Sequence, residues 1–274
     1  MTFREVLTAS HFSGPVLCAG VDPHPEVLAD WGCSDSASGV QSFVSLVMTG
    51  VLESGVRAVK PQVALFERHG IAGMSALSAL LGDLRSAGVL SIGDAKRGDI
   101  GSTMAAYADA WLLPGADFEV DALTVSPYLG VGAILPALEC GAEHGKGVFV
   151  LAATSNPEAP SLQGAVRPSG LSVAQQVVNE VHAFHMDYPN SHSTHGVVVG
   201  ATVAQNRLGL TLSAVPGMPV LAPGFGAQGV ALSDARKLFP ASQRLFPVAA
   251  RSLLTGGPDG FADRIRYASA ELGQ

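Results

Sequence analysis

The sequence predicts a closed (β/α)₈ barrel (TIM barrel), an α/β fold in which eight parallel strands alternate with helices. Three observations favour it. Eight short apolar runs end in Gly, Pro or a polar residue, helical spacing separates most of them, and 274 residues fit the length of one barrel. An open, doubly wound sheet is the rival that the same alternation allows. No linker or shift in composition divides the chain, so we expect a single domain over residues 1–274.

The predicted strands are apolar throughout rather than alternating, which is typical of a parallel sheet covered on both faces. Each is bounded by residues that favour turns. The eight runs are Val16–Val21, Val56–Lys60, Val89–Asp94, Val120–Val125, Val148–Ala153, Gly196–Gly200, Val220–Ala222 and Leu245–Ala249.

Segments with helical spacing follow most of these strands. Two of them end at a glycine, Gly55 and Gly88, in the position that commonly terminates a helix. The segment Thr154–Gly170 is rich in Pro, Ser and Asn and too long for a simple connection, so we expect an active-site loop there. The expected helices are Val40–Ser54, Gly73–Ala87, Gly101–Leu113, Gly132–Cys140, Ser172–Phe184, Val203–Leu212 and Gly260–Leu272.

Charge and composition restrict the partner and the compartment. The formal charge of −7 argues against nucleic acid or an anionic membrane as the main partner, because both need a basic face. No apolar stretch approaches the ~20 residues of a membrane span. The three cysteines are far apart and form no CxxC motif, which fits a reducing, cytoplasmic compartment. A small anionic substrate stays compatible, because Lys and Arg can gather locally.

Charged residues stand at the carboxyl ends of the first three predicted strands, where barrel enzymes carry their chemistry. Asp22 follows the first strand and Lys60 closes the second. Asp94 and Lys96 close the third, two residues apart and therefore on one side of the strand, and Asp99 lies in the loop beyond. A ring of salt bridges that merely closes the barrel is the alternative. Because charged residues make up only 14% of the chain, their concentration here favours an active site.

A glycine-rich loop follows the seventh predicted strand. In Pro223–Gly229, the residues Gly224, Gly226 and Gly229 fit the pattern GxGxxG. The loop follows the seventh strand rather than the first, so it is a weak match to a dinucleotide fingerprint. Backbone N–H groups of such a loop can bind phosphate, and so can Arg251 after the eighth strand. A tight turn beside a surface arginine is the alternative reading.

Four histidines lie close together in the sequence, at His182, His185, His192 and His195. Their spacing, HxxH twice, resembles that of a metal site. The first pair falls at a predicted helix end, where the helix dipole favours His, and the second in a polar loop. We therefore expect no metal site in this segment.

The sequence DAKRGDIGST at Asp94–Thr103 resembles the signature of the orotidine 5′-phosphate decarboxylase family, in its longer bacterial branch. The DxKxxD core alone also resembles metal-dependent sugar-phosphate decarboxylases and synthases, whereas the extended string and the second lysine are more specific. The resemblance covers nearly the whole chain. It also includes Val59–Gln62, Thr124–Gly130, Thr154–Pro157, the Pro223–Gly229 loop and Arg251.

The resemblance implies conversion of orotidine 5′-phosphate to UMP and CO₂ in pyrimidine biosynthesis, without a cofactor or a metal. It implies a charged tetrad of Lys60, Asp94, Lys96 and Asp99, with Lys96 as the acid that protonates C6. It also implies a homodimer in which Asp99 and Thr103 reach the partner's site. The implied substrate contacts are Asp22 to the ribose, Ser155 to the pyrimidine, Gln228 between pyrimidine and phosphate, and Gly224, Gly226 and Arg251 to the phosphate.

Two residues depart from the pattern of this family branch. Ser126 stands where Asn is frequent, and Ala250 precedes Arg251 where a hydroxyl residue is common. Both affect fine contacts rather than the chemistry. Two rival functions remain: a metal-dependent sugar-phosphate enzyme, which a chelator would inhibit, and a catalytically silent phosphoribosyl-binding protein, which would bind UMP without turnover.

Overall fold

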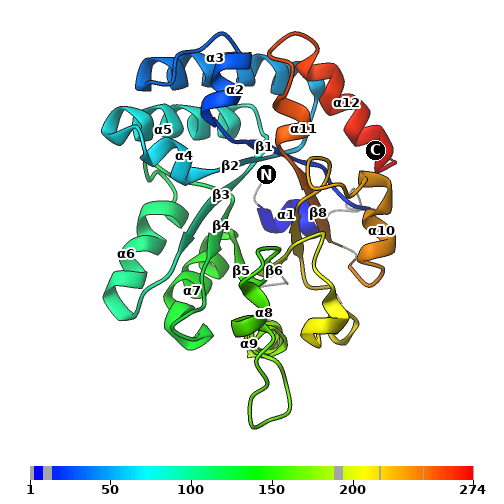
Figure 1. The fold of residues 1–274 in the computed structure, drawn as a ribbon. Helices are drawn as coiled ribbons and strands as arrows, with labels where there is room; N and C mark the ends of the chain where they lie inside the picture. The colour runs from blue at the N-terminus through cyan, green and yellow to red at the C-terminus, as the bar shows by residue number, and fades with distance from the viewer. Residues whose placement is uncertain (1–2, 9–13, 188–193, 216, 243, 274) are drawn as a thin grey trace.

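Eight parallel strands close into a barrel in the computed structural model, which describes residues 3–8, 14–187, 194–215, 217–242 and 244–273. Figure 1 looks into this barrel. Cys18 pairs with Ala58 on one side and with Val248 on the other, so the first strand joins the last and the rival open sheet is excluded. The strands are β1 (Cys18–Val21), β2 (Ala58–Pro61), β3 (Leu90–Arg97), β4 (Ala122–Val125), β5 (Gly147–Ala153), β6 (Gly196–Val199), β7 (Val220–Pro223) and β8 (Leu245–Ala249).

Helices surround the barrel and bury its outer face, and the predicted fold class is confirmed (Figure 1). Within the described part of the chain, no helix combines the length and the apolar character needed to cross a membrane. The longer helices are α3 (Ala37–Ser54), α5 (Gly70–Ser86), α6 (Gly101–Leu112), α7 (Leu135–His144), α9 (Val173–Asp187) and α12 (Phe261–Glu271). The shorter ones are α1 (Phe3–Thr8), α2 (Pro25–Asp30), α4 (Val63–Glu67), α8 (Ala159–Gln163), α10 (Ala235–Leu238) and α11 (Arg251–Leu254), with 3₁₀ turns η1 (Val131–Ile134), η3 (Gln205–Leu208), η4 (Leu212–Ala214) and η5 (Leu232–Asp234).

The glycines predicted to stop two helices do so. Gly55 follows α3 with φ 71° and Gly88 lies just beyond α5 with φ 70°, both in the left-handed region that glycine adopts without a steric cost. At the other end of α3, the hydroxyl of Ser36 accepts a hydrogen bond from the backbone N–H of Gly39 at 3.2 Å. These local signals therefore set the helix ends to within a few residues of the predicted ones.

The helix predicted at Val203–Leu212 is wrong. The structure has two 3₁₀ turns there, η3 and η4, with Gly209 at φ 62° between them. The side-chain oxygen of Asn206 accepts the backbone N–H of Arg207 at 2.9 Å, which competes with a regular helical bond. Asn and Gly therefore interrupt a segment whose apolar spacing alone fits a helix.

The segment Thr154–Gly170, expected to be a loop, contains the short helix α8. Gln163 in this helix accepts the backbone N–H of Thr154 at 2.9 Å and donates to its hydroxyl at 2.8 Å. These two bonds fix the chain where it leaves β5. The first part of the segment is thus held near the carboxyl end of β5, whereas residues 165–170 are exposed and extend away from the barrel (Figure 1).

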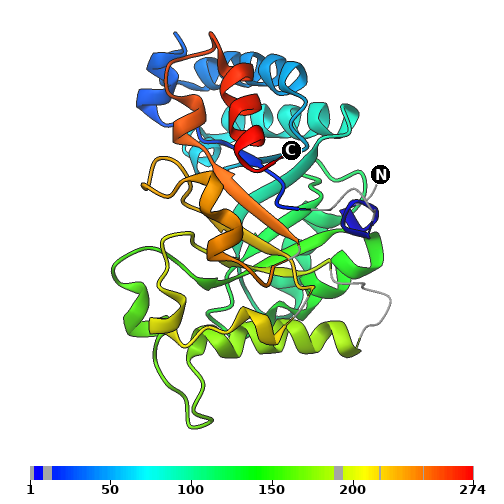
Figure 2. The ribbon, with the colours of Figure 1, turned by 90° about the vertical axis from the view of Figure 1, so that its right-hand side faces the viewer.

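The N-terminal helix α1 closes the amino end of the barrel, a role that the sequence patterns did not indicate. Phe3 is fully buried, and its ring stacks on Phe246 at 5.9 Å and meets Phe149 edge-on at 6.1 Å. In Figure 2, α1 lies at the opposite end from α2 and α11, which follow the carboxyl ends of β1 and β8. The side chain of Phe3 therefore fills the barrel interior at its amino end, and the carboxyl end stays available for a pocket.

Candidate active site

A cavity of about 370 Å³ opens at the carboxyl ends of the strands, and every strand or the loop after it contributes to the lining. This is the end of a barrel at which active sites lie. Residues predicted from the sequence occur among the lining side chains. They are Asp22, Lys60, Asp94, Lys96, Ser155, Gly224, Gln228 and Arg251.

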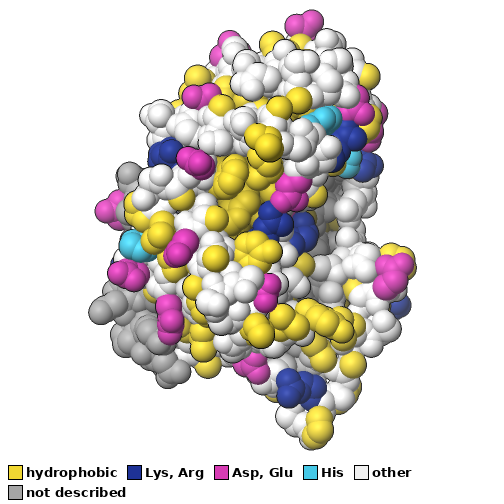
Figure 3. Space-filling model, turned by 90° about the vertical axis from the view of Figure 1, so that its left-hand side faces the viewer, with side chains coloured by type: hydrophobic (Ala, Val, Ile, Leu, Met, Phe, Trp, Pro, Cys, Tyr) yellow, Lys and Arg dark blue, Asp and Glu magenta, His cyan; other side chains and the backbone are white. Residues whose placement is uncertain are grey.

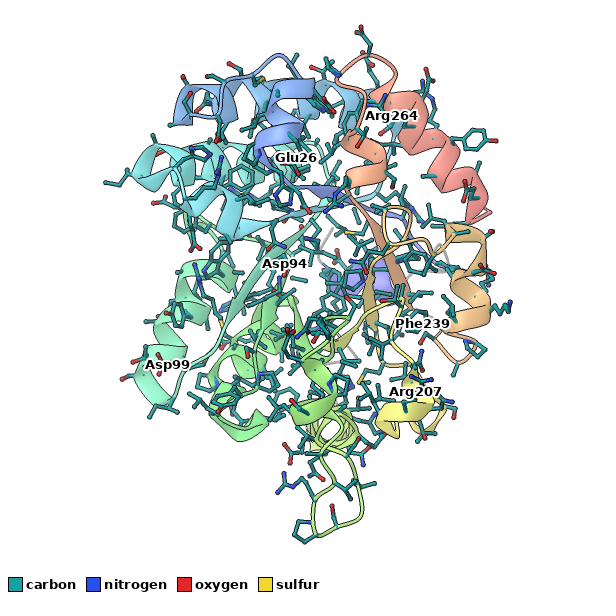
Figure 4. The ribbon with its side chains drawn as sticks, viewed as in Figure 1. Glu26, Asp94, Asp99, Arg207, Phe239 and Arg264 are labelled. Atoms are coloured by element: carbon teal, nitrogen blue, oxygen red, sulfur yellow. The ribbon has the colours of Figure 1, made fainter. Side chains whose placement is uncertain are left out.

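The charged residues of the first three strands form one connected chain on the cavity floor. Asp94 lies at the centre, on the inner wall of the barrel mouth (Figure 4). Its Oδ2 accepts a hydrogen bond from Nζ of Lys60 at 2.8 Å, and its Oδ1 accepts one from Nζ of Lys96 at 2.6 Å. Oδ1 of Asp22 lies 3.8 Å from the ammonium nitrogen of Lys60. Two cations are thus held by one carboxylate inside a cleft.

Burial differs sharply between the two lysines. The side chain of Lys60 is 4% exposed, whereas that of Lys96 is 45% exposed and borders the open cavity. Burial alone would lower the pKa of Lys60, but the Asp94 and Asp22 carboxylates outweigh it and raise that pKa above its usual value. Burial likewise disfavours the Asp94 carboxylate, yet Lys60 and Lys96 hold the pKa of Asp94 well below its ordinary range. Lys60 and Asp94 are therefore ionised at neutral pH.

Two uncharged side chains also donate hydrogen bonds to Asp94, and the sequence patterns predicted a role for neither of them. The hydroxyl of Thr124 donates to Oδ1 at 3.0 Å, and Nε2 of Gln62 donates to Oδ2 at 3.2 Å. Oε1 of Gln62 also accepts from Lys96 at 3.4 Å. A signal existed for both residues: Gln62 comes two residues after Lys60, and Thr124 is a polar residue inside an apolar strand. Each oxygen of Asp94 thus accepts two hydrogen bonds.

Lys96 reaches Asp94 through an unusual backbone. Simple alternation puts residues 94 and 96 on one side of a regular strand. Here the β3–β4 register shifts between Gly93 and Arg97, and Lys96 has φ 49°. Among the described residues, Lys96 is the non-glycine residue with a positive φ. The structure therefore brings the two side chains together, but through a bulge and a left-handed residue rather than a flat strand.

Asp22 presents a polar atom without a hydrogen bond. Its Oδ1 is buried and has no hydrogen-bond partner within the described structure, although the residue lines the cavity. A buried oxygen without a hydrogen bond is costly unless a ligand donates to it, even where a cation lies nearby as Lys60 does here. A hydroxyl group of a bound molecule would satisfy it.

The glycine loop after β7 borders the same cavity through Gly224 and Gln228. Gly224 has φ 113°, a backbone conformation that side-chain-bearing residues rarely adopt, so this position favours glycine. Gly226 does not line the cavity, and its N–H donates to the carbonyl of Val230 at 2.8 Å. Gly226 therefore shapes the loop (φ 74°) rather than offering its N–H to the cavity. Arg251, the first residue of α11, is exposed and also lines the cavity.

Asp99 and Thr103 do not line the cavity of their own chain. Figure 4 shows Asp99 well away from Asp94, in the segment that leads into α6. Its Oδ1 accepts the backbone N–H of Ile100 at 2.8 Å, and Thr103 is exposed in the first turn of α6. The face of the barrel on this side exposes apolar side chains around a small group of basic ones (Figure 3).

The histidine segment lies elsewhere. The ring centroids of His182 and His185 are 6.2 Å apart, and those of His185 and His195 are 6.0 Å apart, while His192 falls outside the described residues. Nδ1 of His195 accepts the backbone N–H of Val148 at 3.2 Å. Across the described ranges, no group of three or more His, Cys, Asp or Glu side chains is arranged to hold a metal ion.

Several lining residues were not predicted. Leu151 and Val198 give the cavity an apolar wall, and His24 adds a polar group near Asp22 in the chain. The apolar pair belongs to strands whose side chains alternate between barrel interior and exterior. Only the register of the closed barrel decides which of them face the cavity.

Comparison with known proteins places these features in one family. The model of the orotidine 5′-phosphate decarboxylase / HUMPS family matches residues 15–257. The chain is 47% identical to an orotidine 5′-phosphate decarboxylase of Salinispora tropica, covering 92% of this chain and 91% of that protein. It is 44% identical to one of Corynebacterium efficiens, covering 94% and 91%. A crystal structure of a candidate orotidine 5′-phosphate decarboxylase from Streptomyces avermitilis superposes with a TM-score of 0.88 at 41% identity, over 99% of this chain and 95% of that one.

Proposed function

The chain belongs to the orotidine 5′-phosphate decarboxylase / HUMPS family, and from this premise we propose that it converts orotidine 5′-phosphate to UMP and CO₂ in pyrimidine biosynthesis. We propose further that the reaction needs no cofactor and that Lys96 protonates C6. The observation that carries this is the chain Lys60–Asp94–Lys96, with 2.8 and 2.6 Å contacts at the floor of the barrel cavity.

The chemical problem is an electron pair left on C6 when the carboxylate departs as CO₂. This pair lies in the plane of the pyrimidine ring, where the π-system of the ring cannot delocalise it, so the protein must stabilise charge where it develops. Lys96 supplies a fixed cation beside the cavity and then a proton to C6. Asp94 holds that cation and lies where the substrate carboxylate would enter. A like-charge contact between the two carboxylates is relieved as CO₂ leaves.

The rest of the substrate has matching partners around the cavity. In our proposal Oδ1 of Asp22, which has no hydrogen bond in the structure, accepts a ribose hydroxyl, and Ser155 contacts the pyrimidine. Gln228 spans pyrimidine and phosphate, and Arg251 binds the phosphate with charge-assisted hydrogen bonds. The glycine loop, through Gly224 and the turn at Gly226, lets the backbone approach the phosphate closely. Binding energy from the phosphate can then be used in the transition state.

We also propose a homodimer in which Asp99 and Thr103 enter the site of the partner subunit. Both residues are accessible and outside their own cavity. Large apolar side chains are exposed on the loops after β3 and β4: Ile100, next to Asp99 in the chain, is 61% exposed, and Tyr128 is 79% exposed. The backbone N–H of Ser126 donates to the carbonyl of Arg97 at 2.7 Å, so the loops carrying these residues lie together. A second copy would cover this apolar surface and complete the tetrad.

A dilution series tests the dimer. Sedimentation of the protein should show dimers at micromolar concentration, and Asp99→Ala should lose activity without losing the dimer. Mixing Asp99→Ala with Lys96→Ala protein should restore part of the activity, because one of the mixed sites then has both groups. A fully active monomer would contradict the proposal.

The cytoplasmic location is proposed from the cysteines. Cys18, Cys33 and Cys140 are free thiols in the structure, as a reducing compartment allows. Burial raises the pKa of Cys18 to about 12, so this thiol beneath Lys60 stays neutral and unreactive.

The decisive assay is purified protein with orotidine 5′-phosphate in EDTA, followed by the change in pyrimidine absorbance. Turnover that EDTA leaves unchanged supports the proposal. Activity that EDTA abolishes and Mg²⁺ restores would favour the metal-dependent sugar-phosphate enzyme instead. Tight UMP binding without turnover would indicate a silent phosphoribosyl-binding protein. Against the metal reading, both oxygens of Asp94 already accept two hydrogen bonds each.

A further inference from the structure

Thr124 is a buried hydroxyl residue in β4. Its side chain forms hydrogen bonds to Asp94 and to Lys96, the two charged residues of β3 at the cavity. The residue is 1% exposed. Its Oγ1 lies 3.0 Å from Oδ1 of Asp94 and 3.0 Å from the backbone nitrogen of Lys96. Burying a hydroxyl is unfavourable unless it is hydrogen-bonded, and here both of its capacities are used. The position is therefore built for a polar group.

The direction of both bonds follows from the chemistry of the groups. The backbone N–H of Lys96 can only donate, so the Thr124 oxygen accepts it. The ionised carboxylate of Asp94 can only accept, so the hydroxyl proton points to Oδ1. The same Oδ1 accepts Nζ of Lys96 at 2.6 Å. Backbone and side chain of Lys96 are thus connected to each other through one hydroxyl and one carboxylate oxygen.

The bonds lie at the bulge in the barrel. Gly93 pairs with Leu123, and the next pair is Arg97 with Val125, so β3 has more residues than β4 between the same two pairs. The N–H of Lys96 therefore meets the Thr124 side chain in place of a ladder carbonyl. At this point Lys96 has φ 49°, a left-handed conformation that is sterically unfavourable for a residue with a Cβ atom. Such a conformation persists only where surrounding contacts impose it.

We propose that Thr124 is a positioning residue for the decarboxylation. Its hydroxyl holds the left-handed turn at Lys96 and orients the Asp94 oxygen that receives the Lys96 ammonium group. The inference rests on the proposed function, because it assigns Thr124 to the acid of that reaction. A methyl-bearing residue of equal size without the hydroxyl would leave the Lys96 N–H unbonded and the ammonium group misplaced.

Three substitutions separate the hydroxyl from the packing. Thr124→Val keeps the shape and removes the hydroxyl, Thr124→Ala removes both hydroxyl and methyl, and Thr124→Ser keeps the hydroxyl. For Val and Ala we expect kcat to fall about 10²-fold, the loss associated with a small misplacement of a catalytic group. KM and the dissociation constant of UMP should change little, since the phosphate contacts are remote. Thr124→Ser should restore most of kcat.

Ser91→Ala is the matched control. Ser91 is a buried hydroxyl at the other end of β3, 3.1 Å from Oδ2 of Asp121 and away from the cavity. This variant should lower the denaturation midpoint and leave kcat unchanged, so that lost stability and lost positioning are told apart. If Thr124→Val does not fold, the Ala and Ser variants still decide.

Three outcomes would overturn the proposal. They are wild-type kcat in Thr124→Val or Thr124→Ala, a Ser variant as impaired as the Ala variant, or an equal loss of kcat in Ser91→Ala. An inactive wild-type protein would instead contradict the decarboxylase function itself, so the two failures are distinguishable.

Discussion

At the scale of single residues, one ammonium group carries the proposed chemistry. Lys96 is half-exposed toward the cavity and bonded to Asp94 at 2.6 Å, while Lys60 supplies Asp94 with a second, buried partner. Removing Lys96 therefore leaves Asp94 still paired. We expect Lys96→Ala to lower kcat by at least about 10³-fold, since it removes both the acid and a preorganised charge. The assay is steady-state decarboxylation.

The fold of Lys96→Ala is checked by its denaturation midpoint and by UMP binding, both of which should stay close to those of the wild type. An appreciable residual kcat in a folded variant would remove Lys96 as the acid.

Arg251 tests the phosphate assignment at the same scale. Arg251→Ala should lower kcat/KM by about 10- to 150-fold, which corresponds to a loss of about 1.5–3 kcal/mol of transition-state binding, the range of hydrogen bonds to charged groups. Arg207→Ala is the control, because Arg207 is exposed on η3 and lies apart from Asp94 in Figure 4. Equal kcat/KM values for the two variants would refute the assignment.

At the scale of elements, we expect the helix α1 to stabilise the barrel although it is only 6 residues long. Phe3 packs between the barrel residues Phe149 and Phe246. Phe3→Ala should lower the free energy of unfolding by about 3–5 kcal/mol, because it leaves a cavity at the amino end of the barrel. Urea denaturation measures this.

Ile71→Ala serves as the comparison for Phe3→Ala. Ile71 is 89% exposed at the start of α5, so its truncation should change the free energy of unfolding by no more than about 0.5 kcal/mol. A Phe3 variant as stable as this control would show that α1 does not close the barrel.

The elements also show where sequence reasoning succeeds and where it stops. Strand and helix positions follow from apolar runs and glycine stops, such as Gly55, because these are local properties of the chain. The helix expected at Val203–Leu212 failed because Asn206 and Gly209 redirect the backbone locally. The extension of β3 to Arg97 through a bulge was not predicted, because it depends on the register with β4.

At the scale of the whole molecule, we expect the fully buried His195 and the partly buried His185 to couple stability to pH. Burial, followed by repulsion from nearby His and Arg charges, lowers the pKa of His185 to about 4 and that of His195 to about 3. In the unfolded chain both titrate near their ordinary value of about 6.5. Below that pH the unfolded state binds more protons than the folded state, so the free energy of unfolding decreases as the pH is lowered.

We expect the free energy of unfolding to decline between pH 6.5 and 4.5 by at most about 1.4 kcal/mol per pH unit for each histidine. Urea titrations at several pH values measure this slope. His185→Gln should reduce it. An identical slope in the variant would show that His185 does not contribute.

By itself, the sequence determined the alternation of strands and helices, the number of strands, and the placing of Asp22, Lys60 and Asp94 at strand ends. These follow from periodicity and turn chemistry, which act over a few residues. Only the tertiary structure decided that Thr124 and Gln62 share Asp94 with the lysines, and that Asp99 lies outside the cavity of its own chain. Barrel closure fixes the register between strands far apart in sequence, and no local pattern encodes that register.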